Sequence, residues 1–406
     1  MTGIIADGRY TVTTQCGSRE VTAGELFVAR DRGVFRYTAD YLRRPEAYAL
    51  APALPLTGGN QPVDGLGPFG DSAPDRWGRR LMLRRYGRSR LPEYAYLLGV
   101  SDASRQGALR FYDEAGNALS SHETEIPPER ELPDLLTIAD AVAEGRDDIT
   151  DVDARRLFRA TGSLGGARPK ANVTVGTGDA AELYMAKFPK PDGDDWDVIG
   201  WEAVCVDLQQ DAGITVPTHR LLTVSGRHVL MTRRFDRAGA RRIPYLSAMS
   251  ALEAHDGDGG DWVDLVDVVR VHGADTGELW RRAAFGVLVG NTDDHLRNHG
   301  FLWGGRSWTV APAFDVNPTP LDAGDDHEMT LFGSGELTLS DFLTHDALAL
   351  FGMPRQEALS WCAGAAELFA GVTDRARRAG LSHRDVTVMG SRFSDAVAQA
   401  GDATRR

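Results

Sequence analysis

The sequence predicts an α+β protein, with strands concentrated toward the N-terminus and helices dominating the C-terminal part. Residues 1–55 contain three short alternating segments, broken by Gly and Asp, that are typical of strands. Two more strand segments, at 171–175 and 183–188, flank a glycine-containing turn. Beyond residue 236 the apolar spacing becomes that of helices, apart from one hairpin.

The first elements can be justified from residue type and spacing. Alternation predicts strands at 10–14, 25–29 and 34–38. A helix follows at 75–86, because Asp75 is a suitable N-cap and the apolar residues Trp77, Leu81 and Met82 share one helical face. The next strands and a second helix follow a polar, proline-bearing stretch at 120–133, which is interpreted as a linker. In that second helix the buried face is predicted to consist of Val198, Trp201, Val204, Cys205 and Leu208, with Gly213 at its end.

These boundaries suggest three domains within the 406 residues. Residues 1–125 are expected to form a β-rich N-terminal subdomain. Residues 126–235 would follow as a mixed domain, and 236–406 as a mainly helical domain. Hydrophobic and charged contents of 42% and 25% are those of an ordinary globular protein.

Charge and cysteine usage narrow the class of protein. A net charge of −13 argues against a chain-wide nucleic-acid face. The seven arginines between Arg76 and Arg90 are interpreted as a solvated helix face. The three cysteines are far apart and match no disulfide framework or metal spacing, which suggests a reducing cytoplasm. The start lacks the core of a signal peptide, and the apolar stretch at 283–289 is too short to span a membrane. A cytoplasmic protein without a membrane partner is therefore expected.

Phosphoryl-transfer chemistry is indicated by the stretch 291–299, Asn-Thr-Asp-Asp-His-Leu-Arg-Asn-His. Asp293 and Asn298 have the Asp-x4-Asn spacing of a kinase catalytic loop, in which the aspartate accepts the hydroxyl proton and the asparagine holds Mg²⁺. Asp315 follows a predicted hairpin at 301–310, which would return it to Asn298 as a second Mg²⁺ ligand. Capping hydrogen bonds in a polar loop would explain one such residue but not the whole set.

Two upstream features offer groups that bind phosphates. Gly165 and Gly166 lie in the stretch 162–170, whose backbone N–H groups can form an anion-binding nest, although a plain turn also explains a glycine pair. The stretch is not a Walker A loop, because the Gly-Lys-Ser/Thr ending is absent. Lys187 shares a strand face with apolar neighbours, and a buried ammonium needs an anionic partner. The alternative is an edge lysine whose head reaches water.

His295 and His299, beside two aspartates, also allow a transition-metal hydrolase. That interpretation is weaker, because the sequence has no His-x3-His pair on a helix and no obvious third ligand. We therefore assign His295 to orienting the loop or contacting a nucleotide phosphate.

Together these motifs resemble the HipA family, the serine/threonine-kinase toxins of bacterial type II toxin–antitoxin modules. In the N-terminal region the similar motifs are Phe35-Arg-Tyr, Tyr41-Leu, Leu54-Pro-Leu and Gly107-Ala-Leu-Arg-Phe111. In the remainder they are Ser163-Leu-Gly-Gly-Ala-Arg-Pro-Lys170, Ala186-Lys187-Phe188-Pro, Arg234-Phe-Asp-Arg237, Thr292-Asp-Asp-His-Leu-Arg-Asn298 and Pro312-Ala-Phe-Asp315. The resemblance implies a two-lobed protein-kinase-like fold with a mostly helical C-terminal lobe.

The resemblance further implies ATP- and Mg²⁺-dependent phosphorylation of a protein serine or threonine. Asp293 matches the catalytic aspartate, and Asn298 and Asp315 match the Mg²⁺–nucleotide ligands. Ser163 matches a serine whose autophosphorylation displaces the phosphate loop and silences the kinase. With the assignments above, the residues expected at ATP are Gly165, Gly166, Ala167, Arg168, Lys170, Lys187, Arg233, Arg234, Phe235, His295, Asn298 and Asp315.

The resemblance also implies partners, and the sequence differs from the family pattern at a few positions. A small HipB-like helix-turn-helix antitoxin is the expected partner, and DNA would be bound only indirectly through it. Pro169 and Arg233 replace residues that are acidic in well-known family members, which changes details of nucleotide contact. Asp315 is followed by Val-Asn and not Phe-Gly, so a kinase-type activation segment is not assumed.

Two alternative functions remain beside the protein kinase. A small-molecule kinase would share the Asp-x4-Asn logic, but the N-terminal strand region and Ser163 favour a protein substrate. A catalytically idle co-repressor that partners a DNA-binding protein is the other alternative. The intact set of Asp293, Asn298, Asp315 and Lys187 argues against inactivity.

Overall fold

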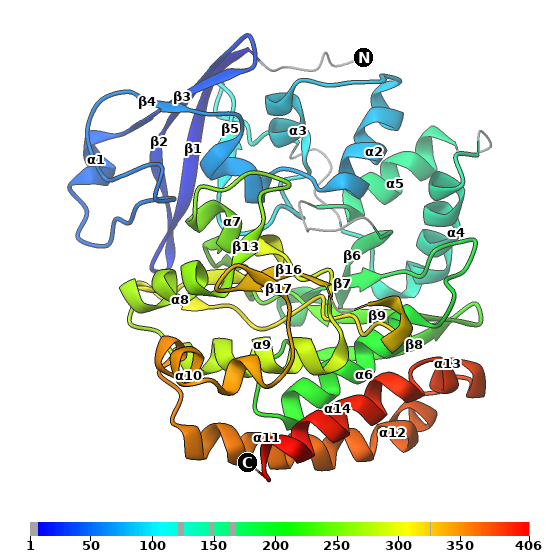
Figure 1. The fold of residues 1–406 in the computed structure, drawn as a ribbon. Coiled ribbons are helices and arrows are strands. Elements are labelled where there is room, and N and C mark those ends of the chain that lie inside the picture. Colours follow the sequence, from blue (N-terminus) through cyan, green and yellow to red (C-terminus); the bar gives the residue numbers. More distant parts are fainter. Residues whose placement is uncertain (1–6, 121–125, 147–149, 163–167, 325, 406) are drawn as a thin grey trace. The chain divides into compact units, whose positions relative to one another are not determined.

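The computed structural model describes residues 7–120, 126–146, 150–162, 168–324 and 326–405. The chain divides into two compact units. Unit 1 comprises Met1–Pro191, Arg233–Ala254 and Phe301–Ser307, and unit 2 comprises Asp192–Thr232, His255–Gly300 and Trp308–Arg406. The strand-rich N-terminal region and the run of C-terminal helices confirm the predicted α+β class (Figure 1). Across the described ranges, no helix is long and apolar enough to cross a bilayer.

Unit 1 begins with an antiparallel five-stranded sheet of order β4-β3-β2-β1-β5. Its strands are β1 (Gly8–Cys16), β2 (Arg19–Ala29), β3 (Arg32–Tyr37), β4 (Gln61–Val63) and β5 (Arg110–Tyr112). The three strands predicted first are therefore confirmed. Val12, Leu26 and Phe35, one from each of β1, β2 and β3, have no exposed surface, so the alternating pattern does bury one face of this sheet.

The basic helix predicted at 75–86 is α2 (Arg76–Tyr86), and its cap is as expected. The Gly78 N–H donates to Asp75 Oδ1 at 2.7 Å. The predicted apolar face is confirmed, because Trp77, Leu81 and Met82 are all buried. The other helices of unit 1 are α1 (Ala39–Leu42), α3 (Glu93–Gly99), α4 (Leu132–Ala143), α5 (Asp151–Ala160) and α7 (Ala248–Ala251).

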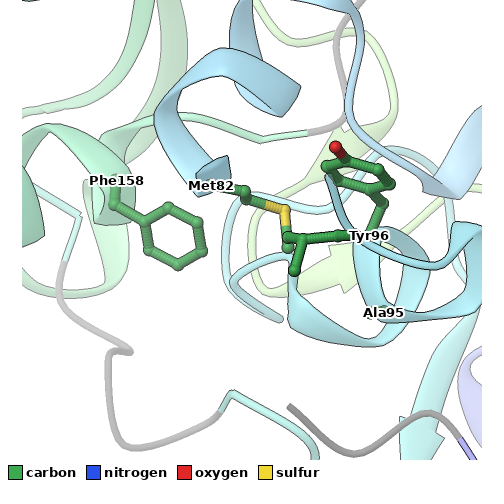
Figure 2. Close-up of a cluster of buried hydrophobic side chains, with 5 residues drawn as sticks. Met82, Ala95, Tyr96 and Phe158 are labelled. Atoms are coloured by element: carbon green, nitrogen blue, oxygen red, sulfur yellow. The ribbon is translucent and has the colours of Figure 1, made fainter. Parts of the chain in front are cut away.

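A buried cluster joins α2, α3 and α5 through side chains that include Met82, Tyr96 and Phe158 (Figure 2). Two arginines of α2 cover its aromatic members. The Arg79 guanidinium lies 4.4 Å from the Tyr96 ring centroid, and that of Arg85 lies 4.2 Å from the Phe158 centroid. The basic stretch interpreted as a solvated face therefore also packs, through cation–π contacts and alkyl stems.

The second sheet segment of unit 1 is the antiparallel pair β6 (Lys170–Val175) and β7 (Glu182–Lys187). The expected linker lies partly against it: the Thr174 N–H donates to the Pro127 carbonyl at 2.9 Å, and Leu132 is buried. Backbone and apolar contacts therefore hold the end of that polar stretch. This unit also contains the short strands β10 (Arg237–Ala238), β11 (Arg241–Arg242) and β12 (Tyr245–Ser247).

Unit 2 contains most of the long helices. They are α6 (Val198–Asp211), α8 (Trp262–Val271), α9 (Thr276–Val289), α10 (His345–Phe351), α11 (Arg355–Ala370), α12 (Val372–Arg378), α13 (His383–Val388) and α14 (Gly390–Ala403). Every residue predicted for the buried face of α6 is buried, and Gly213, one residue past the C-cap, has φ +76°. Aromatic contacts link the helices: the rings of Phe369 on α11 and Phe393 on α14 are 5.8 Å apart.

The strands of unit 2 are short. They include β8 (His219–Val224), β9 (Arg227–Arg233), β13 (Gly260–Asp261), β16 (Asp326–Leu331) and β17 (Ser334–Glu336). β13, β16 and β17 form one small sheet. The Glu328 N–H on β16 donates to the Thr292 carbonyl at 3.1 Å, so this sheet supports the loop that carries Asp293.

Candidate active site

The loop bearing Asp293 starts at a tightly terminated helix. Gly290 caps α9 in the left-handed conformation, φ +66°, which a side chain would disfavour. Its N–H donates to the Val287 carbonyl, and the Asn291 N–H donates to the Gly286 carbonyl at 2.8 Å. Because α9 is buried along most of its length, the loop starts from a rigid point.

Asp293 and Asn298 are brought together as the Asp-x4-Asn spacing predicts. A single 3-10 turn, η5 (Leu296–Asn298), folds the loop, and the Asn298 N–H donates to the His295 carbonyl at 2.8 Å. The Asn298 amide nitrogen donates to the Asp293 main-chain carbonyl at 3.2 Å. With its nitrogen committed in this way, the side chain presents Oδ1 on its other side. Asn298 is buried while Asp293 is exposed, so the Asp293 carboxylate is accessible to a substrate.

The predicted hairpin between Asn298 and Asp315 has a hydrogen bond at each end. At its turn, the Gly304 N–H donates to the Ser307 carbonyl at 3.0 Å. At its base, the Ala311 N–H donates to the Gly300 carbonyl at 2.7 Å. The two strands are β14 (Gly300–Trp303) and β15 (Trp308–Val310). The chain thus returns toward the loop that carries Asp293 just before Asp315.

Two asparagines that sequence reasoning missed connect Asp315 to that loop. The Asn317 amide nitrogen donates to Asp315 Oδ1 at 2.9 Å, and the Asn317 main-chain N–H donates to Asn291 Oδ1 at 3.0 Å. Asp315 itself has φ +59°, a conformation that costs a non-glycine residue energy and needs support from its surroundings. The only sequence signal was that both asparagines lie within or beside the motifs.

The two histidines of the loop have different surroundings. His299 is buried, with Nε2 3.1 Å from Asp294 Oδ1 and its ring edge-on to Trp262 at 4.9 Å. His295 is half-buried, and its Nδ1 has no hydrogen-bond partner among the described residues. Its assignment to a nucleotide phosphate stays a prediction.

Two lysines predicted to bind ATP face each other in unit 1. Lys170 on β6 is the register partner of Lys187 on β7, so both side chains leave the same face of the strand pair. Both are buried, at 4% and 6% exposure. Lys170 Nζ lies 2.9 Å from Asp75 Oδ2, a buried ion pair that also ties β6 to the start of α2. A buried ammonium group needs an anionic partner, and Asp75 provides one for Lys170.

The phosphate loop itself lies largely outside the described residues, and this applies to Ser163, Gly165, Gly166 and Ala167. Its two ends are described. A Cβ added to Gly162 would lie 2.2 Å from the Ser104 carbonyl oxygen, so only glycine fits there. At the other end, Arg168 is half-buried and the Phe188 N–H donates to the Pro169 carbonyl at 2.9 Å.

The segment Arg233–Phe235 is held mainly by its arginines. Arg233 forms a half-exposed ion pair with Glu182 at 2.6 Å. Arg234 is buried, and its guanidinium donates to Asp236, to the Ser104 carbonyl and to Asn172 Oδ1. Because those donors are committed inside the protein, a nucleotide contact by Arg234 would have to involve its main chain. Phe235 is half-buried and lies 6.2 Å from the Tyr245 ring.

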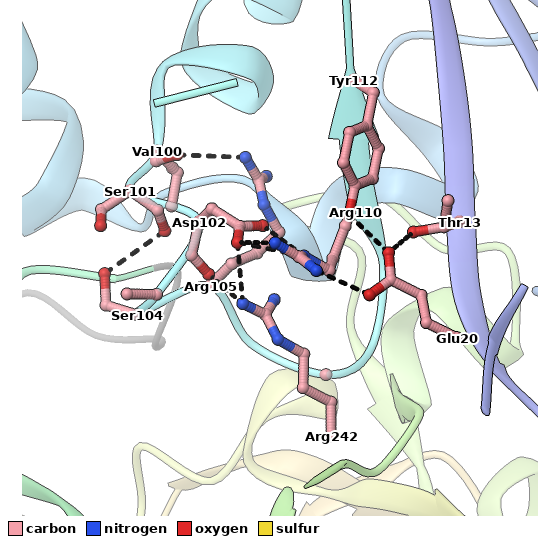
Figure 3. Close-up of polar contacts among 12 residues, drawn as sticks. Thr13, Glu20, Val100, Ser101, Asp102, Ser104, Arg105, Arg110, Tyr112 and Arg242 are labelled. Atoms are coloured by element: carbon pink, nitrogen blue, oxygen red, sulfur yellow. Dashed lines mark hydrogen bonds and ion pairs between the residues drawn. The ribbon is translucent and has the colours of Figure 1, made fainter. Parts of the chain in front are cut away.

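A charged network that the sequence did not reveal extends this arrangement (Figure 3). Asp102 lies 2.7 Å from Arg110 and 3.1 Å from Arg242, and Arg110 also pairs with Glu20 at 2.6 Å. Burial alone would raise the pKa of Asp102, but the guanidinium groups of Arg242 and Arg110 outweigh it and hold that pKa below its usual value. The carboxylate therefore stays charged and links residues 102–110 to the 233–242 segment.

The predicted site residues thus fall into two groups. Asp293, His295, Asn298 and Asp315 lie in unit 2. There a hydrogen bond joins Asn298 to Asp293, and Asn317 links Asp315 to Asn291 at the start of the same loop. The predicted residues Arg168, Lys170, Lys187 and Arg233–Phe235 lie in unit 1.

Comparison with known proteins decides the family. Residues 162–372 match the HipA-like C-terminal domain, and residues 18–112 match the HipA N-terminal domain. The chain belongs to the HipA family. The fold agrees: HipA of Shewanella oneidensis MR-1, solved with HipB and operator DNA, aligns with a TM-score of 0.69 and 16% identity, covering 98% of this chain and 100% of that one.

A second solved structure is less similar to this HipA-family chain. The Helicobacter pylori proinflammatory kinase CtkA aligns with a TM-score of 0.44 and 16% identity, covering 58% of this chain and 93% of that one. Among curated proteins no match was found.

Proposed function

We propose that this HipA-family chain is a serine/threonine protein kinase that uses ATP and Mg²⁺ and acts as a growth-arresting toxin. The observation that supports it most is the connected set in unit 2. The Asn298 amide bonds to the Asp293 carbonyl, and Asp315 is linked through Asn317 to Asn291 at the start of the same loop. A loop built for capping alone would not require this returning aspartate.

Each residue has a distinct role in this proposal. Asp293, exposed on the loop, accepts the proton of the serine or threonine hydroxyl. Asn298 and Asp315 offer an amide and a carboxylate oxygen, the ligand types that suit Mg²⁺. When bound, Mg²⁺ would supply positive charge against the phosphates. Lys170 and Lys187 are proposed to bind the phosphates from unit 1.

The test is phosphate transfer by the purified protein with labelled ATP and Mg²⁺, alone and with a bacterial lysate. Wild type should label itself or a lysate protein. Asp293→Asn should reduce labelling at least ~10²-fold, because a positioned base is lost. Asp267→Asn, an exposed change on α8, is the matched control and should leave labelling intact. ATP consumption with metabolites only would support a small-molecule kinase, and no transfer to any acceptor would contradict both.

Silencing by autophosphorylation at Ser163 is part of the proposal. A phosphate adds nearly two negative charges. Beside a loop that binds phosphates, and close in sequence to Lys170, that charge would oppose nucleotide binding. Wild type should therefore lose activity during incubation with ATP, whereas Ser163→Ala should not, and mass spectrometry should find the phosphate on Ser163. Equal loss of activity in both proteins would exclude this mechanism.

The proposed partner is a HipB-like helix-turn-helix antitoxin. The structurally similar Shewanella protein was solved with HipB and operator DNA. The net charge of −13 predicts that this chain alone does not bind DNA. Gel-shift assays with and without the antitoxin test this, because a shift by the isolated chain would contradict it. A phosphoproteomic comparison of cells that express wild type or Asp293→Asn would identify the protein substrate.

A further inference from the structure

Arg392 is a fully buried arginine in the first turn of the C-terminal helix α14. Its Nε donates to the Thr319 carbonyl at 2.9 Å, and its Nη2 lies 3.5 Å from the Pro320 carbonyl. A positive charge in the first turn opposes the dipole of its own helix. The residue is therefore not explained by the stability of α14, and its contacts lie elsewhere.

The guanidinium of Arg392 lies directly against Gly290, the C-cap of α9. A Cβ added to Gly290 would lie 2.6 Å from Arg392 Cζ, so the glycine makes room for the guanidinium. The C-terminal end of a helix is the negative end of its dipole, which suits a buried cation. Gly290 also bonds to Thr319, because the Thr319 hydroxyl donates to the Gly290 carbonyl at 2.7 Å.

Both segments that Arg392 contacts lead to predicted site residues. Gly290 directly precedes Asn291, the first residue of the loop that carries Asp293. Thr319 lies two residues after Asn317, which bonds to both Asn291 and Asp315. One side chain from α14 thus contacts the start of the catalytic loop and the end of the Asp315 segment (α9 and α14 in Figure 1).

We propose that Arg392 is a positioning residue, which holds the Asp293 loop and the Asp315 segment in register. Its fork-shaped guanidinium can donate to main-chain carbonyls of one segment while stacking on the glycine of the other, which a lysine cannot reproduce. Without it, the segment that follows Asp315 would lose a contact that holds it against the start of the Asp293 loop. This inference rests on the proposed function, because it assigns Arg392 a role in that reaction.

Kinetics test the proposal in the full-length protein. Arg392→Lys should lower kcat at least about 10-fold, as expected when a catalytic group is misplaced by about 1 Å. It should also raise the Mg²⁺ concentration for half-maximal activity, which loss of stability alone would not do. Thr319→Val, which removes only the bond to Gly290, should change both quantities in the same direction to a smaller extent. Gln399→Ala is the matched control on α14, because Gln399 bonds to the Leu339 N–H and not to the loop.

Amide hydrogen exchange gives a second measurement that needs no activity. In Arg392→Lys, the amides of Asn317 and Thr319 should exchange at least about 10-fold faster, because their bonds to Asn291 Oδ1 and to the Val289 carbonyl join the two segments. Amides within α11 should be unchanged. Arg392→Lys and Thr319→Val could instead unfold at a lower temperature but keep wild-type Mg²⁺ dependence and wild-type amide exchange. That result would show that Arg392 has only a structural role. If the wild-type protein has no kinase activity, the proposed function is wrong. If amide hydrogen exchange is unchanged in the variants, the positioning role is wrong.

Discussion

Replacing Asp236 with asparagine tests whether buried charges hold the 233–242 segment in place. Asp236 is 1% exposed. Its two oxygens accept from Arg234 Nε at 2.7 Å, Arg237 Nη1 at 2.8 Å and the Gly107 N–H at 2.7 Å. Asparagine has nearly the same shape but no charge, and its NH₂ group turns one acceptor into a donor. The buried guanidinium of Arg234 and the half-buried guanidinium of Arg237 would then lose their shared carboxylate.

The size of the effect follows from these contacts. Removing one partner of a buried ion pair destabilises by ~3–5 kcal/mol, because the remaining charge is left uncompensated. For a domain of 150–250 residues each kcal/mol lowers Tm by ~2–4 °C, so Asp236→Asn should lower Tm by about 6–20 °C. Asp40→Asn, whose side chain is 82% exposed, is the control. It should shift the free energy of unfolding by less than ~0.5 kcal/mol.

The pH dependence of the same variant gives a second check. Burial alone would raise the pKa of Asp236, but the charges of Arg234 and Arg237 outweigh it and hold that pKa well below its usual value. A folded pKa below the unfolded value of about 3.9 gives stability that is present above that pH and lost as pH falls through the folded pKa. The Tm difference from wild type should therefore be full at neutral pH and shrink in acid. A Tm within about 1 °C of wild type at neutral pH would refute the reasoning, since it corresponds to under ~1 kcal/mol.

Two further predictions concern stability in urea titrations. Asp75→Ala should lose about 1 kcal/mol more than Asp75→Asn, because asparagine can still cap α2 through the Gly78 N–H while both variants lose the pair with Lys170; equal losses would disprove the capping role. The hydrogen bond that His228 Nδ1 donates to the Asp197 carboxylate raises the pKa of His228, so the stabilisation by this pair is full below the unfolded pKa of about 6.5 and is lost as pH rises through the folded pKa. His228→Gln should accordingly destabilise more near pH 6 than near pH 9, and a pH-independent difference would exclude this coupling.

Local sequence rules were sufficient where the partners are close in the chain. The cap of α2 by Asp75 depends on residues three apart, and the buried face of α6 follows from the helical period. The Asp293–Asn298 contact is equally local, with a separation of five residues. In each case a spacing of a few residues determines which side chains meet, so residue type and spacing predict the contact.

Contacts between distant segments were not predictable in this way. Asn291 and Asn317 are 26 residues apart, Thr319 and Arg392 are 73 apart, and Gly107 and Asp236 are 129 apart. Periodicity indicates that a residue is buried but not what it meets. In addition, an arginine is expected to be exposed when only its residue type is known, because arginines are rarely buried without a partner. For these two reasons the sequence did not predict the Asn291–Asn317 hydrogen bond or the contact of Arg392 with Thr319.

The contacts of buried arginines near the candidate site have one physical cause. Segments next to predicted site residues are irregular, so their main-chain carbonyls have no helical or sheet partners and must be satisfied otherwise. Buried arginines do this: Arg234 in unit 1, and Arg282 and Arg392 in unit 2, all donate to main-chain carbonyls. The acceptor of Arg282 is Ala311, on the path to Asp315. A guanidinium has five donors in a rigid plane, whereas an ammonium group on a flexible stem would satisfy the same carbonyls at a greater entropic cost. Irregular loops can therefore be rigid enough to position a catalytic group when arginines provide the hydrogen bonds that regular structure would otherwise provide.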